Sequence, residues 1–100
     1  MITDRFKLTG KTALITGAGK GIGRGIAIAF AEMGANVICV ARTQTDIMDV
    51  ATEAEKFGVR ALAVSCDVTS ETALQALVQQ VEDTFGGVDI LVNNAGAPGK

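Results

Sequence analysis

The 100-residue sequence contains no histidine, tyrosine or tryptophan, and it has only one proline and two cysteines. Histidine and tyrosine are common proton donors in enzymes, so the chain lacks two side chains on which acid–base catalysis often depends. Cys39 and Cys66 stand within or at the end of apolar segments, without CxxC spacing and with no histidine nearby. We interpret both as small core residues and predict no metal site.

The sequence also lacks a basic excess and a long apolar run. Nine lysines and arginines against eleven acidic residues leave a formal charge of -2. This balance excludes the simplest electrostatic case for binding nucleic acid or an anionic membrane surface. The apolar runs are far shorter than the roughly 18 to 20 residues of a membrane-spanning helix. Residues 1–10 contain no apolar stretch of signal-peptide length, so we expect a cytoplasmic protein.

Four short segments are apolar and read as strands buried on both faces. They are residues 12–16, 36–41, 60–66 and 88–93. A composition of 48% hydrophobic and 20% charged residues suits one globular unit over residues 1–100.

Apolar residues recur at helical spacing between these strands. The predicted buried faces are Ile22, Ile26, Ala29, Phe30 and Met33; Ile47, Val50, Ala54 and Phe57; and Leu74, Leu77, Val78, Val81 and Phe85. Glycines mark the expected helix ends, at Gly34, Gly58 and Gly86. Thr43 followed by Asp46 resembles a capping box, and Thr69 or Ser70 is expected to cap the third helix.

The alternation of strands with helical crossovers predicts an α/β fold with a parallel sheet. We expect a doubly wound, Rossmann-like βαβαβαβ sheet in the strand order 3-2-1-4, because parallel crossovers are right-handed. Such sheets bind ligands at the carboxyl ends of their strands, where the winding reverses. Residues 17–23 and 93–96 should therefore lie side by side.

The turn after the first predicted strand is rich in glycine. Gly17, Gly21 and Gly23 follow a G-x-x-x-G-x-G spacing. Glycines let the backbone turn sharply, let a ligand approach closely and let the following helix lie near the sheet. The amino terminus of that helix offers unpaired N–H groups to an anion, so this turn is a candidate pyrophosphate site.

Residues 16–23 (TGAGKGIG), residues 93–96 (NNAG) and Asp67 after the third strand resemble the short-chain dehydrogenase/reductase family. The resemblance runs from about Gly10 to Gly96, and the two motifs together are more specific than either alone. It implies that the glycine turn holds a dinucleotide pyrophosphate, that residues 67–68 border the adenine and that the NNAG loop lines the nicotinamide ribose. The cofactor-binding residues it implies are Gly17, Gly21, Ile22, Gly23, Asp67, Val68, Asn94, Ala95 and Gly96.

Two of these positions also have a structural interpretation. Asp67 stands near the start of the third predicted helix, where it can be a solvated turn residue. Asn94 carries an amide that can satisfy backbone groups at the end of a strand. For Asn94 the structural and the cofactor-binding roles are compatible.

Arg42 ends the second predicted strand, 19 residues after Gly23. An acidic residue near this position hydrogen-bonds the ribose of NAD, whereas an arginine can pair with the 2′-phosphate of NADP. Lys20 in the glycine turn adds a second cation on the same side. We therefore predict NADP(H) as the cofactor, with NAD(H) as the alternative; ordinary surface roles for both cations are the competing interpretation.

The resemblance also implies catalytic groups that this sequence does not contain. The family transfers the proton with a Tyr-x-x-x-Lys pair and a Ser, often completed by an Asn. Because the sequence has no tyrosine, we assign no catalytic residue to it. We expect residues 1–100 to be the amino-terminal part of a longer single-domain enzyme that forms homo-oligomers.

Three functions are compatible with these patterns. The first is an NADP(H)-dependent oxidoreductase that transfers a hydride between the nicotinamide and a small ketone or secondary alcohol. The sequence is similar to bacterial family members that act on hydroxysteroid-type or 3-oxoacyl substrates. The second is a non-catalytic dinucleotide-binding module, and the third is a fragment that docks onto a partner through its fourth strand. A native chain that stops at Lys100 would favour the second or the third.

Overall fold

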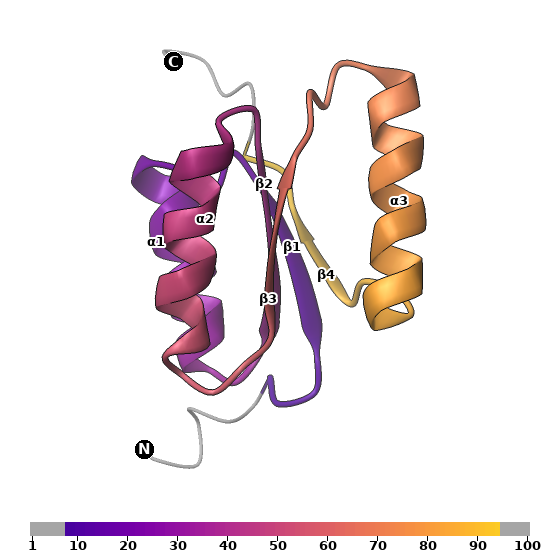
Figure 1. The fold of residues 1–100 in the computed structure, drawn as a ribbon. Helices are drawn as coiled ribbons and strands as arrows, with labels where there is room; N and C mark the ends of the chain where they lie inside the picture. The colour runs from indigo at the N-terminus through magenta and orange to yellow at the C-terminus, as the bar shows by residue number, and fades with distance from the viewer. Residues whose placement is uncertain (1–7, 95–100) are drawn as a thin grey trace.

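The structure is a computed structural model, and it describes residues 8–94. Its strands are β1 (Thr12–Thr16), β2 (Asn36–Ala41), β3 (Ala61–Ser65) and β4 (Ile90–Val92). Its helices are α1 (Gly21–Glu32), α2 (Gln44–Glu55) and α3 (Glu71–Phe85), and they alternate with the strands along the chain (Figure 1). The predicted strand–helix alternation is therefore confirmed, with β3 and β4 shorter than expected.

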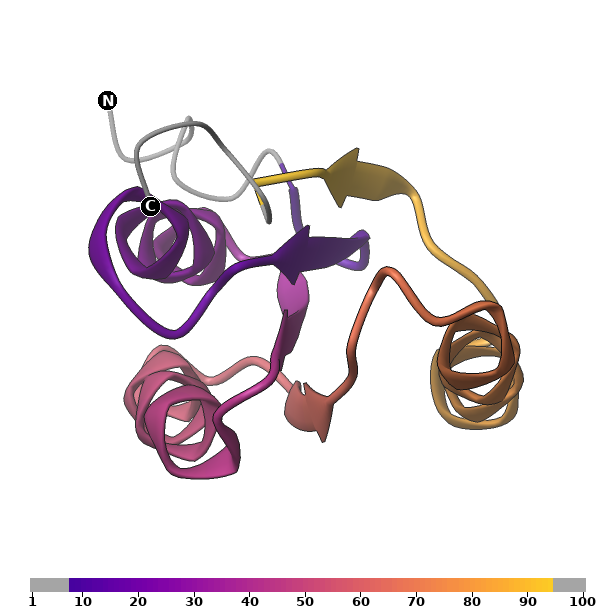
Figure 2. The same ribbon diagram turned by 90° about the horizontal axis from the view of Figure 1, so that it is seen from above.

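The sheet has the strand order β3-β2-β1-β4, and all its neighbouring strands are parallel. The helices α1 and α2 cover one face, and α3 lies on the other (Figure 2). The chain therefore reverses its winding between β1 and β4. This arrangement confirms the predicted doubly wound, Rossmann-like fold.

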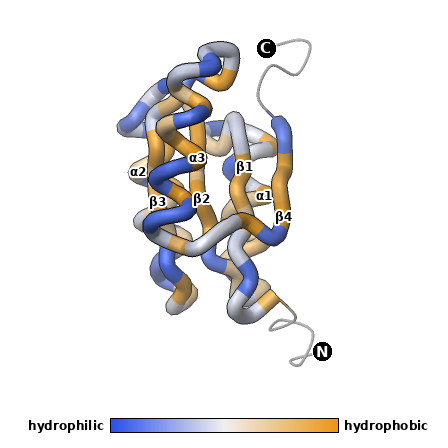
Figure 3. Tube along the Cα trace, turned by 90° about the vertical axis from the view of Figure 1, so that its right-hand side faces the viewer, coloured by the Kyte–Doolittle hydropathy of each residue, from blue (hydrophilic) through white to orange (hydrophobic). Residues whose placement is uncertain are grey.

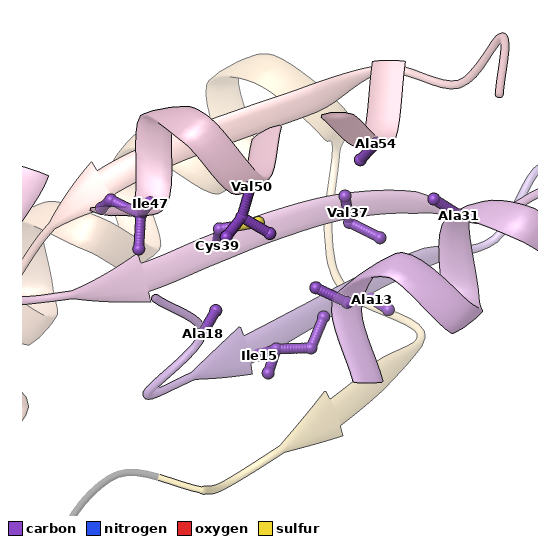
Figure 4. Close-up of a cluster of buried hydrophobic side chains, with 10 residues drawn as sticks. Ala13, Ile15, Ala18, Ala31, Val37, Cys39, Ile47, Val50 and Ala54 are labelled. Carbon is purple, nitrogen blue, oxygen red and sulfur yellow. The ribbon is translucent and has the colours of Figure 1, made fainter. Parts of the chain in front are cut away.

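The core has one cluster on each face of the sheet, because alternate residues of a strand point to opposite faces. On the face of α1 and α2, the strands contribute the fully buried Ile15, Val37 and Cys39 (Figure 4). On the face of α3, Ile38 and Val40 pack with Leu77 and Val81. Both faces of β2 are therefore dry, as its unbroken apolar sequence predicts.

Burial determines the chemistry of Cys39 in this core. Both cysteines are free and buried. Desolvation raises the pKa of the Cys39 thiol to about 11, because a low-dielectric environment disfavours the thiolate. Cys39 is therefore protonated at neutral pH and serves as a small apolar core residue, in agreement with the sequence-based interpretation.

The predicted buried face of α1 is confirmed in part, since Ile26 and Phe30 pack against the core. Ile22 is 76% exposed, and Ala29 is also exposed. The residues that α1 buries are Gly23, Ala27 and Ala31. These residues recur at four-residue spacing, so they lie on one face of the helix, where Ala27 and Ala31 join the core cluster of the sheet.

The ends of α2 and α3 also test the predicted caps. Thr43 is the N-cap residue of α2, but its side chain makes no capping hydrogen bond, so the capping-box prediction is wrong. In α3 the Ser70 hydroxyl accepts a hydrogen bond of 3.2 Å from the Ala73 N–H, as expected.

Two further residues predicted to be buried are exposed, namely Phe57, which follows α2, and Val78 of α3.

Apolar side chains are left exposed near β4. From the side of α3, the strands β1 and β4 lie beside the helix rather than beneath it (Figure 3). Leu91 of β4 is 67% exposed, and Val88 is 40% exposed. Exposed apolar surface at a sheet edge favours association. Within residues 8–94, every helix is too short or too polar to cross a bilayer.

A pair of isoleucine truncations tests this description of the core. Ile38→Ala should lower the free energy of unfolding by about 2–5 kcal/mol, because it leaves a cavity between β2 and α3. Ile22→Ala removes the same atoms from an exposed position and should change stability by less than about 0.5 kcal/mol. Urea unfolding followed by circular dichroism measures both, and equal losses would contradict the burial pattern.

Candidate functional site

A cavity of about 560 Å³ lies at the carboxyl ends of β1, β2 and β3. The three loops that follow these strands form its wall. The lining residues are Gly17, Gly19, Lys20, Val40, Ala41, Arg42, Thr43, Asp46, Cys66, Asp67, Val68 and Thr69. This is the edge of the sheet at which the sequence predicts ligand binding.

The glycine turn after β1 leaves the amino terminus of α1 uncapped. Lys20 is the N-cap residue, and in the described part of the chain neither its side chain nor an acidic residue in the first turn pairs with the N–H groups there. Gly21 has a φ of +55°, and a Cβ atom at this position would meet no atom within 4 Å. A left-handed backbone favours glycine, and the open space beside the helix end suits an anionic ligand.

Gly23 has a packing role in the same turn. It is buried, and a Cβ atom there would stand 2.0 Å from the Gly17 carbonyl oxygen and 2.7 Å from Asn94 Nδ2. Asn94 Nδ2 donates a hydrogen bond of 3.2 Å to that same carbonyl. The glycine turn and the end of β4 are therefore in contact, as the fold prediction required.

Thr16 is a residue of this junction that sequence reasoning did not assign. Its buried hydroxyl accepts a hydrogen bond from the Asn94 N–H at 2.9 Å and lies 3.1 Å from Asn93 Oδ1. The signals in the sequence were its hydroxyl at the end of a mostly apolar strand and its place at the start of the TGAGKGIG motif. The contact joins residues 78 positions apart, so only the folded chain reveals it.

Asp67 is held in place by Thr69. Its Oδ1 atom accepts hydrogen bonds from the Thr69 hydroxyl at 2.6 Å and from the Thr69 N–H at 2.9 Å. These two bonds, with a smaller contribution from the Arg42 charge, hold the pKa of Asp67 below its ordinary value. Its other oxygen, Oδ2, has no hydrogen-bond partner among residues 8–94. The spacing of two residues is typical of an Asx turn, and it could have identified Thr69 from the sequence.

The charged side chains of the cavity face one another across the glycine turn and the start of α2. Lys20 Nζ lies 3.8 Å from Asp46 Oδ2. Arg42 has an exposed side chain, and its carbonyl oxygen accepts a hydrogen bond of 3.0 Å from the Ser65 hydroxyl. That bond joins the ends of β2 and β3, so the backbone that carries Arg42 is fixed to the sheet.

The structure brings most of the predicted residues to this site in three groups. Gly17, Lys20, Arg42, Asp67 and Val68 line the cavity. Two more, Gly21 and Ile22, are exposed at the start of α1, outside the cavity lining. Beneath the turn lie Gly23 and Asn94, where they pack and hydrogen-bond. The remaining two, Ala95 and Gly96, lie outside the described residues. Ligand contacts for all of them stay predictions.

The sequence and structure both match one family. A model of the short-chain dehydrogenase family matches residues 11–100, so the chain belongs to this family. Among its relatives is the 7alpha-hydroxysteroid dehydrogenase of Escherichia coli strain K12. It is 46% identical over 97 residues, which cover 97% of this chain and 38% of that protein. The chain spans about a third of the length of the curated relatives that it matches first, 31% and 38%.

Two solved structures resemble the fold closely. L-sorbose reductase from Gluconobacter frateurii, complexed with NADPH and L-sorbose, matches with a TM-score of 0.87 and 45% identity, covering 92% of this chain and 35% of that one. A NAD+-bound xylitol dehydrogenase matches with a TM-score of 0.82 and 35% identity, covering 85% of this chain and 33% of that one. Similar folds therefore hold either dinucleotide.

A glycine-to-alanine pair tests the contact between the glycine turn and β4. Gly23→Ala forces a methyl group onto the Gly17 carbonyl and should destabilise the protein by about 1–3 kcal/mol or more, as overpacking does. Gly25→Ala lies on the same helix, where an added Cβ meets nothing within 4 Å. It should stabilise the helix by about 0.5–1 kcal/mol. Thermal unfolding measures both, and a stable Gly23→Ala protein would contradict the packing.

The Asp67–Thr69 contact can be tested by titration. Thr69→Val removes the hydroxyl donor and should raise the pKa of Asp67 toward its ordinary value, whereas Thr72→Val, on the first turn of α3, should not. Because the folded-state pKa is lowered, the wild-type carboxylate stabilises the fold above about pH 4 and loses this effect as the pH falls. Carboxyl NMR titration measures the shift, and an unchanged Asp67 in Thr69→Val would contradict the assignment.

Proposed function

We propose that the whole protein is an NADP(H)-dependent oxidoreductase that transfers a hydride between the nicotinamide and a ketone or secondary alcohol. The observation that carries the proposal is the cavity at the carboxyl ends of the strands, which Lys20 and Arg42 line together with Asp67. Two cations beside the adenosine end of a dinucleotide site favour a phosphate on the ribose. No acidic residue follows β2 directly, since Ala41 is followed by Arg42 and Thr43.

The residues present fit a dinucleotide. The uncapped start of α1 and the open space beside Gly21 suit the pyrophosphate. At the cavity, Asp67 Oδ2 accepts no hydrogen bond from residues 8–94 and can accept one from the adenine amino group, and Val68 lines the same cavity. We assign the 2′-phosphate to Lys20 and Arg42. The nicotinamide ribose is assigned to the loop of Asn94, Ala95 and Gly96.

A bound nicotinamide supplies or takes up the hydride. The carbonyl or hydroxyl oxygen of the substrate must gain or lose a proton in the same reaction. This proton transfer needs a side chain whose pKa lies near the working pH. The sequence has neither histidine nor tyrosine. We therefore place the proton transfer on residues of the whole protein outside these 100 positions, in agreement with the shorter span of this chain relative to its relatives.

The names of the relatives indicate the general class of substrate. One relative is named as a hydroxysteroid dehydrogenase, and one similar structure contains L-sorbose. These names support a small molecule with a ketone or a secondary alcohol. A hydroxysteroid or a 3-oxoacyl compound, a homo-oligomeric assembly and a cytoplasmic location stay predictions.

Turnover distinguishes this function from a non-catalytic module. The whole protein, incubated with NADPH and a panel of ketones that includes 3-oxosteroids, 3-oxoacyl thioesters and ketoses, should oxidise the cofactor in the presence of at least one of them. Tight binding of NADPH without turnover of any ketone or alcohol would favour the cofactor-binding module instead.

Charge reversal tests the cofactor preference. Arg42→Asp should weaken NADPH binding far more than NADH binding, by roughly 1.5–3 kcal/mol, because a charge-assisted contact is lost and a repulsive one is added. Lys56→Asp also reverses one positive charge, but at the carboxyl end of α2, outside the cavity lining. It should leave the ratio of the two affinities unchanged. Fluorescence titration of both cofactors measures the ratio, and equal losses would refute the 2′-phosphate assignment.

A further inference from the structure

We propose that Asp46 determines cofactor selectivity by competing with the 2′-phosphate for Lys20, so that it lowers the preference for NADP(H) over NAD(H). This inference rests on the proposed function of the cavity. The spacing of Asp46 from Thr43 in the sequence predicts only a role in a helix cap.

Asp46 faces the cation that the phosphate would use. It is the third residue of α2, and it lines the same cavity as Lys20 and Arg42. Its Oδ2 atom stands 3.8 Å from Lys20 Nζ. The Asp46 side chain is 30% exposed, whereas the Lys20 side chain is 83% exposed. The lysine side chain is therefore freer to move toward a ligand than the carboxylate is.

Close packing keeps the carboxylate in the cavity. Gly19 lies against the first turn of α2, and a Cβ atom on Gly19 would stand 2.9 Å from Asp46 Cβ and 3.7 Å from Ile47 Cγ2. Ile47 itself is fully buried. The start of α2 that carries Asp46 is thus packed against the glycine turn, which keeps the carboxylate within reach of Lys20.

The charged residues that line the cavity balance one another. Two cations, Lys20 and Arg42, face two carboxylates, Asp46 and Asp67. The Asp67 carboxylate already accepts two hydrogen bonds from Thr69. Among residues 8–94, Asp46 forms its ion pair with Lys20 only. A phosphate monoester carries about -1.5 to -2 charges at pH 7, so it must displace this pair, whereas the neutral ribose hydroxyl of NAD(H) need not.

Asp46 has a structural role that the test must separate from this one. Thr43 does not cap α2 with its side chain, and Asp46 is the acidic residue of the first turn. A negative charge there stabilises the helix dipole. Such a role changes the stability of the protein and affects both cofactors equally, so the ratio of the two affinities isolates the selectivity.

The test is the affinity of the whole protein for NADP+ and for NAD+ by calorimetry, in the wild type and in Asp46→Asn. The variant should bind NADP+ about two- to fivefold more tightly, the size expected for a partly exposed charge pair. Its affinity for NAD+ should stay within about twofold, since that ribose carries no charge to repel. Asp49→Asn removes the same charge from an exposed position on the same helix and should change neither affinity.

A second comparison tests whether Lys20 carries the effect. In a Lys20→Gln background, Asp46→Asn should improve NADP+ binding by less than half as much as in the wild type, because the competed cation is gone. The gain should also shrink in high salt, since screening weakens exposed charge pairs. Asp46→Ser, with thermal unfolding of every variant, replaces Asp46→Asn should the latter fold poorly.

An unchanged NADP+/NAD+ ratio in both Asp46 variants, or weaker NADP+ binding, would overturn the inference. A gain of full size in the Lys20→Gln background would overturn the competition for that lysine. Both results leave the proposed function intact, provided that the wild type binds NADP+ and that Arg42→Asp weakens it. A wild type that binds neither nucleotide would overturn the proposed function and the inference together.

Discussion

The close contact between Gly23 and the Gly17 carbonyl is the constraint on which the rest of the site depends. A Cβ atom on Gly23 would stand 2.0 Å from that oxygen, so only glycine lets α1 begin this close to the end of β1. The same carbonyl accepts the hydrogen bond from Asn94 Nδ2, across 77 positions of sequence. One carbonyl thereby fixes the start of α1, the glycine turn and the end of β4. The Thr16 hydroxyl, bonded to the Asn94 N–H, ties the same loop to β1.

The cavity beside this turn is lined by charged residues of both signs. Lys20 and Arg42 contribute two positive charges to its lining, and Asp46 and Asp67 contribute two negative ones. Thr69 saturates one oxygen of Asp67 and lowers its pKa, so this carboxylate stays ionised over the physiological range. The net charge of such a site attracts neither cations nor anions strongly. Its selectivity therefore depends on where each charged group lies.

Much of the fold could be predicted because its signals are local. The unbroken apolar run of β2 is typical of a strand buried on both faces, and the structure buries Val37, Ile38, Cys39 and Val40 completely. Helix faces were predicted less well. Hydrophobicity correctly pointed to Ile26 and Phe30, which pack against the core. It also pointed to the exposed Ile22 and missed Ala27 and Ala31, which α1 buries. The prediction that Thr43 caps α2 with its side chain was also wrong, since a suitable spacing does not guarantee a hydrogen bond.

The sequence by itself determined the order of the elements, the parallel sheet, the glycine turn and the family, because periodicity and glycine spacing act through neighbouring residues. Only the tertiary structure decided which side chains share the cavity. Asp46 faces Lys20 at 3.8 Å because α2 packs against Gly19, and Thr16 meets Asn94 because β4 pairs with β1. Such contacts arise from packing between elements far apart in the chain. These contacts form because backbone segments of different elements come close together in the folded chain, and no pattern of neighbouring residues predicts them.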